Sequence, residues 1–192
     1  MANHSVSSSV YSDTHFSLLG LPQRFAVDLD ALERAYKNVQ AQVHPDRFAA
    51  APAAQRRVAM QWAARANEAY TVLRTPLKRA AYLCELRGVA IEAESNTAMP
   101  REFLMQQMQW REALDEATHP WDASKVQALR TQLTQAQDAL AQQVATAIDE
   151  QNDMAQAAAR VRQWMFVERF AQDVLRALHA AEDAASSHLK SA

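Results

Sequence analysis

Apolar side chains recur every three or four residues along most of the chain, the spacing that aligns them on one face of an α-helix. The first long repeat predicts a helix that begins after the cap residue Asp28. It ends near Val43, because Pro45 forces His44 out of the α-helical backbone region. The apolar stripe of this helix is Leu29, Leu32, Tyr36, Val39 and Val43.

A second long helix is predicted after the segment His44-Pro45-Asp46, and its apolar stripe is Val58, Trp62, Ala66, Ala69 and Leu73. The connection is short, so the two helices are expected to be antiparallel. FSLLGL before them predicts a short helical turn, and PLKRAAYLCELR after them predicts a short helix that stops at Gly88. We therefore expect one unit over residues 16–88, preceded by a disordered tail over residues 1–15.

The second half of the chain predicts a separate helical unit. A polar, irregular stretch over residues 89–99 is typical of a linker. Three further helical repeats follow, separated by the breaks HPW and EQND, at residues 101–117, 122–149 and 153–183. Short breaks place neighbouring helices antiparallel, which favours a three-helix bundle over residues 100–184 and a frayed tail over residues 185–192.

Composition agrees with an all-α fold. The 192 residues include only two glycines, Gly20 and Gly88, whereas sheets and tight hairpins depend on glycine-containing turns. Hydrophobic residues make up 49% of the chain, which is enough for one or two buried cores.

Charge and cysteine content exclude several classes of function. The net charge of -2 provides no basic field for nucleic acid or acidic membranes. The single cysteine, Cys84, excludes an internal disulfide, and no Cys-x-x-Cys suggests a metal, so we expect no cofactor. The first fifteen residues lack the features of a secretory or mitochondrial leader, and no apolar run predicts a membrane span. A cytoplasmic protein without nucleic-acid or membrane partners is expected.

The tripeptide His44-Pro45-Asp46 is the first candidate for a contact site. Proline fixes its own φ and makes His44 extended, so the imidazole and the Asp46 carboxylate project in defined directions from the tip of the helical hairpin. The carboxylate could accept two hydrogen bonds from an arginine of a partner. No third group is placed to activate a nucleophile, so no catalytic centre is predicted. The alternative is a purely structural turn that ends one helix and begins the next.

The context of the tripeptide favours the contact site. From Phe16 to about Tyr82, the segments FSLLGLP, HPDRF and ANEAYTVLRTPLKRAAY together resemble a J domain. In that family, the hairpin presents the HPD motif to a 70-kDa heat-shock chaperone of the DnaK/HscA class and stimulates its ATP hydrolysis. The resemblance gives this role to His44, Pro45 and Asp46. It gives structural roles to Asn67, Ala69, Tyr70, Leu73, Pro76 and Arg79.

The basic face that J domains usually carry on the helix before the motif is sparse in this chain. Arg34 and Lys37 are its only cations, and Arg47 follows the motif directly. We include all three residues in the expected chaperone contact. Weak long-range steering favours one dedicated chaperone over general recruitment.

The predicted helix at residues 101–117 has two apolar sides on a helical wheel. One side contains Phe103, Trp110 and Leu114. The other contains Leu104, Met105 and Met108, and acids surround it. A bundle buries one such stripe, so the second is expected to be an exposed surface for a partner, with methionine supplying adaptability. The alternative is that the J domain docks on this second side and buries it.

The last predicted helix repeats this pattern on a smaller scale. Its core side is expected to contain Trp164, Val167, Ala171, Val174 and Leu178. Phe166 falls away from that side, among charged residues, as either a second contact or an accident.

FLMQQMQWREALDEA, from Phe103 to Ala117, extends the resemblance to residues 16–178 and to the HscB family of J-type co-chaperones in iron-sulfur cluster assembly. In that family, the C-terminal bundle binds the cluster scaffold IscU and delivers it to the chaperone HscA. Gln109 stands where relatives often carry an acid. The resemblance implies the following client-binding residues: Leu104, Met105, Met108, Gln109, Glu112, Glu116 and Phe166.

Two other functions remain open at this stage. A J-domain protein with a different client, such as unfolded polypeptides, would bind denatured substrates, although the chain lacks a Gly/Phe-rich segment and a cysteine zinc module. An enzyme would need clustered ligands or a nucleophile beside a base, whereas His44, His119 and His179 lie on separate predicted elements. We therefore expect an adaptor that is not an enzyme.

Overall fold

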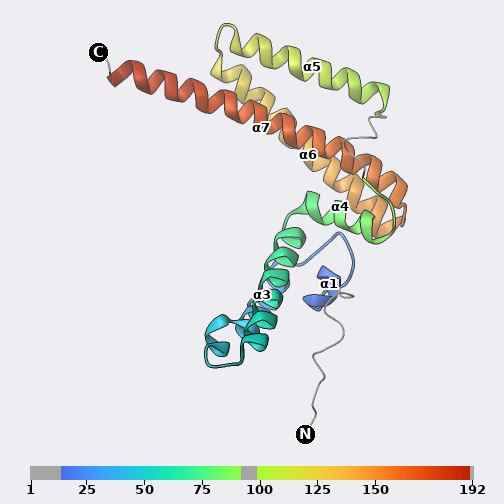
Figure 1. Ribbon diagram of the computed structural model, residues 1–192. Coiled ribbons are helices and arrows are strands. Elements are labelled where there is room, and N and C mark those ends of the chain that lie inside the picture. The colour runs from blue at the N-terminus through green and yellow to red at the C-terminus, as the bar shows by residue number, and fades with distance from the viewer. Residues whose placement is uncertain (1–13, 92–98, 191–192) are drawn as a thin grey trace. The chain divides into compact units, whose positions relative to one another are not determined.

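The computed structural model of the chain describes residues 14–91 and 99–190. Every regular element in this part of the chain is a helix, and the only β pairing within it is an isolated bridge between Thr118 and Trp121. The described chain divides into two compact units, Met1–Leu83 and Cys84–Ala192 (Figure 1). The predicted all-α class is confirmed.

The first unit is built around an antiparallel pair of helices, α2 and α3. Its elements are α1 (His15–Leu18), α2 (Leu29–Val43), the 3-10 helix η1 (Pro45–Phe48), α3 (Ala53–Arg74) and the part of α4 (Pro76–Leu86) up to Leu83. The Asp28 carboxylate caps α2, as predicted, because it accepts hydrogen bonds from the backbone N–H groups of Asp30 at 2.9 Å and Ala31 at 3.1 Å. The end of α2 at Val43 also agrees with the prediction.

Small residues of α3 allow the hairpin to pack closely. Ala59, Ala66 and Ala69 are buried, and α2 contributes the fully buried Leu32. The rings of Tyr36 and Tyr70 stack between α2 and α3, with their centroids 4.3 Å apart. These contacts hold the two helices side by side and fix the position of the turn that joins them.

Two large residues of the predicted stripes lie outside this core. Leu29 is 54% exposed and Val58 is 41% exposed, while Trp62 is only half-buried. On α3 the neighbouring Ala59 is buried in place of Val58. Val58 is therefore turned out of the core, toward the end of the hairpin that carries η1.

The second unit is a bundle of three helices in which chain neighbours are antiparallel, as predicted (Figure 1). It contains α5 (Arg101–Thr118), α6 (Ala123–Ala145), the π-helical turn η2 (Thr146–Glu150) and α7 (Met154–Lys190). Asp122 caps α6 through the N–H groups of Ser124 and Lys125. The core is lined mainly by apolar residues of α6 and α7, among them Leu129, Leu133, Val144, Val161 and Val167.

The predicted limits of the domains remain predictions. The compact units meet at Leu83 and Cys84, inside α4, whereas the sequence pattern places the limit at residue 88. Most of the expected tail at residues 1–15 and of the expected linker at residues 89–99 lies outside the described residues. At the other end, α7 continues beyond residue 183, where the pattern ends.

Candidate partner-binding sites

The turn that carries the HPD motif is a short, well-defined corner. His44 caps the end of α2 with φ -58° and ψ 131°, outside the α-helical region, as expected for a residue before proline. Pro45 then opens η1, and the Arg47 backbone N–H closes the turn by donating to the His44 carbonyl at 3.0 Å. Local backbone chemistry thus sets the direction of the motif.

The His44 and Asp46 side chains are close to each other and face solvent. His44 Nδ1 lies 3.3 Å from the backbone nitrogen of Asp46 and 3.5 Å from its Oδ2. With Nδ1 unprotonated, the ring accepts the backbone N–H, and with Nδ1 protonated, it pairs with the carboxylate. The Asp46 side chain is 90% exposed, so its charge is accessible to a partner.

The cations around the motif are few and partly engaged. Lys37 Nζ lies 3.1 Å from Glu33 Oε1. Hydrogen bonds from Tyr70 and then Lys37 hold the pKa of the Glu33 carboxyl below its usual value, which keeps this neutralising charge in place. Arg47 Nη1 donates to the Ala41 carbonyl at 3.0 Å and thereby satisfies one of the last carbonyls of α2. Arg34 is exposed on the same helix.

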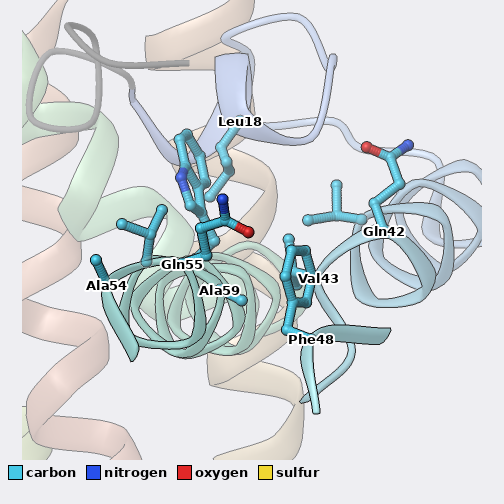
Figure 2. Close-up of a pocket in the computed structure, with 10 residues that line it drawn as sticks. Leu18, Gln42, Val43, Phe48, Ala54, Gln55 and Ala59 are labelled. Atoms are coloured by element: carbon cyan, nitrogen blue, oxygen red, sulfur yellow. The ribbon is translucent and has the colours of Figure 1, made fainter. Parts of the chain in front are cut away.

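An apolar groove of about 770 Å³ lies beside this turn, and sequence reasoning missed it. In Figure 2, Leu18, Val43 and Phe48 come from α1, the end of α2 and η1, and they lie around one hollow against α3. None of the described residues that line it is charged. The pattern assigned two of its lining residues, Val58 and Trp62, to the core. Both are partly exposed instead and line the groove.

The two apolar sides predicted for α5 are present. Trp110 is 5% exposed and Ala117 is fully buried on one side, whereas Leu104, Met105 and Met108 on the other side are 45%, 54% and 60% exposed. We call these last three residues the α5 patch. The expected polar neighbours Gln109, Glu112 and Glu116 are exposed beside it. The helix therefore presents a continuous apolar strip with an acidic border to solvent.

Phe166 is less exposed than the sequence pattern predicts. It is half-buried on α7, where its ring meets Phe103 of α5 edge-on at 5.9 Å and stacks on Phe170 at 6.3 Å. The Arg111 guanidinium lies 5.9 Å from the centroid of the same ring. The ring consequently forms part of the packing between α5 and α7.

A metal centre and a membrane-spanning helix are both lacking among the described residues. No group of three or more His, Cys, Asp or Glu side chains within them is arranged to hold a metal ion. None of the described helices combines the length and apolar character needed to span a lipid bilayer.

Comparisons with known sequences give a consistent set of relatives. A family model described as the HSCB C-terminal oligomerisation domain matches residues 99–175. A protein of Bordetella petrii named Co-chaperone protein HscB homolog is 57% identical over 166 residues, or 86% of this chain and 96% of the relative. A protein of the same name from Burkholderia multivorans is 54% identical over 162 residues, or 84% of this chain and 92% of the relative.

Solved structures extend this likeness to the fold. Chaperone HscB from Vibrio cholerae matches with a TM-score of 0.75 and 31% identity, covering 88% of this chain and 99% of that one. The crystal structure of the human co-chaperone protein HscB matches with a TM-score of 0.80 and 26% identity, covering 85% of this chain and 81% of that one. The likeness therefore includes both helical units.

Proposed function

Because this chain belongs to the HscB family of co-chaperones, we propose that it joins an HscA-type 70-kDa chaperone to an IscU-type scaffold during iron-sulfur cluster assembly in the cytoplasm. The first unit stimulates ATP hydrolysis by the chaperone, and the second unit carries the scaffold. The observation that carries the proposal is the presence of two exposed, chemically different surfaces on two separate units of one chain.

The chaperone contact is assigned to the HPD turn. Asp46 offers an accessible carboxylate on a backbone that proline restricts, which reduces the conformational entropy lost when an arginine of the chaperone binds it. His44 holds the turn through its contact with the Asp46 backbone. Arg34, Lys37 and Arg47 add a local positive charge, although Lys37 and Arg47 have partners within the unit.

The scaffold contact is assigned to the α5 patch and its polar border. Leu104, Met105 and Met108 provide exposed apolar area, and the flexible methionines adapt to the shape of the scaffold. Gln109, Glu112 and Glu116 provide a polar rim, the usual surrounding of an apolar interface centre. Phe166 is the remaining residue assigned to the scaffold contact, and its ring packs on Phe103, next to Leu104 in the chain.

Two sets of substitutions test the assignment, one in each unit. Asp46→Asn should abolish stimulation of the chaperone ATPase, because an amide lacks the charge that an arginine recognises, while leaving scaffold affinity unchanged. Replacing all three residues of the α5 patch by alanine should weaken scaffold binding by about tenfold or more and leave basal stimulation unchanged. Steady-state ATP hydrolysis and titration calorimetry measure the two effects.

The two variants serve as controls for each other, because each should retain the activity that the other loses. Full stimulation by the Asp46 variant would remove the HPD turn from the mechanism. Full scaffold affinity in the α5 variant would place the client surface elsewhere on the molecule.

A further inference from the structure

The groove beside the HPD turn shares its wall with that turn. Val43 directly precedes His44, and Phe48 is the last residue of η1, so both of these lining residues belong to the segment that presents the motif. A protein bound to the exposed Asp46 carboxylate would therefore lie next to the mouth of the groove. The groove and the motif are therefore adjacent along the chain, and Figure 2 shows Val43 and Phe48 on the groove wall.

Part of the packing of the hairpin lies outside the groove. Leu32, Ala66 and the stacked tyrosines are not among the lining residues, whereas Ala59 is both buried and part of the lining. Val58 is 41% exposed and gives the groove an accessible apolar wall. An apolar surface of this kind, concave and without charge, is typical of a site that binds another apolar group.

Charged residues lie near the groove but not among its described lining residues. Lys37 pairs with Glu33, whereas Arg34 on α2 and Arg56 and Arg57 on α3 are exposed. These cations remain available to an acidic face of the chaperone. The uncharged groove would add burial of apolar area to that attraction and to the Asp46 contact.

We infer that the groove binds an uncharged, apolar segment of the same chaperone, seated beside its contact with the HPD motif. The inference rests on the proposed chaperone role of this unit. The absence of charge among the described lining residues selects an uncharged occupant, and the adjacency to the HPD turn selects the chaperone. Scaffold binding is assigned to the other unit, and a bound chaperone segment would bury Val43, Phe48, Val58 and Trp62 together.

A matched pair of substitutions on α3 tests this inference. Val58→Glu places a charge in the groove, whereas Met60→Glu places the same charge at a residue that is 60% exposed and outside the groove lining. Both positions are exposed, so both variants should fold. Val58→Glu should weaken chaperone binding by about tenfold or more, because the occupant cannot solvate the carboxylate, and Met60→Glu should change it by less than about twofold.

Salt provides the second measurement. The ratio of chaperone affinities of the Val58 and Met60 variants, which carry the same added charge, should change by less than about threefold between low and high salt, since apolar contacts are not screened. A ratio that approaches one at high salt would mean that charge, not apolar burial, separates the two variants and would overturn the inference, as would equal affinities of the Val58 and Met60 variants. If the unaltered chain does not stimulate the chaperone at all, the proposed function itself fails.

Other occupants of the groove give different results. Stronger stimulation of the chaperone ATPase by the Val58 variant would indicate that a segment of this chain itself occupies the groove and competes with the chaperone. A changed sedimentation coefficient of the free Val58 variant would indicate a second copy of this chain. Loss of scaffold affinity, with chaperone affinity retained, would indicate the scaffold. Each of these three outcomes overturns the inference.

Discussion

Cys84 is the only thiol of the chain, and its burial holds it protonated. The side chain is fully buried, and loss of solvent, followed by the negative charge of Glu85, raises the pKa of the thiol to about 11. The folded state thus prefers the neutral thiol. Its contribution to stability is complete below the ordinary thiol pKa and is lost as the pH rises toward 11.

Alkylation tests this state of Cys84 directly. At pH 8, iodoacetamide should label the folded protein at least about 100-fold more slowly than the urea-unfolded protein, because the reagent attacks the thiolate. The unfolded chain serves as the control, since its thiol has an ordinary pKa. Equal labelling rates in the two states would show that Cys84 is accessible and ionises normally.

Single residues also mark the limit of sequence-based prediction. Asp28 and Pro45 predict the two ends of α2 correctly, since a cap and a proline act on the backbone within a few residues. The exposure of Phe166 is not predictable in this way. It depends on Phe103 and Arg111, which another helix brings to the ring.

Among the helices, α5 has the clearest division between a structural and a functional side. Trp110 is buried in the bundle, where its ring meets Phe103 edge-on at 6.3 Å. Met108, two residues earlier, is 60% exposed. The same helix therefore stabilises the unit through one side and leaves the other available to a partner.

Thermal or denaturant unfolding of two α5 variants measures this division. Trp110→Ala should lower the free energy of unfolding by about 3–5 kcal/mol, because it removes a large buried ring and leaves a cavity. Met108→Ala, the matched control, should change it by no more than about 0.5 kcal/mol, since the side chain is exposed. Comparable losses in both variants would mean that Met108 is part of the core and unavailable to the scaffold.

At the level of helices, periodicity predicted where α2, α3 and the bundle lie but not which residues bring them together. A search for apolar stripes favours large side chains and therefore placed Val58 in the core of the hairpin. The structure buries Ala59 instead, and small side chains allow two helices to approach closely. Because Val58 was assigned to the core, the groove that it lines beside the HPD turn was not predicted. The π-helical turn η2 was not predicted either, since it has no sequence signal of its own.

The whole molecule combines two surfaces that neither unit carries alone. The first unit has the HPD turn and the groove, and the second has the α5 patch. A chain that holds a scaffold and a chaperone at the same time raises the effective concentration of each for the other. This advantage depends on the covalent connection, so it does not require a fixed arrangement of the two units.

Single-turnover ATP hydrolysis by the HscA-type chaperone tests the adaptor role most directly, measured with the chain alone, with the IscU-type scaffold alone and with both. The chain alone should accelerate hydrolysis, and chain and scaffold together should accelerate it more than the product of their separate effects, because the chain links the two proteins. An unchanged rate of hydrolysis in the presence of the chain, with or without scaffold, would contradict the account.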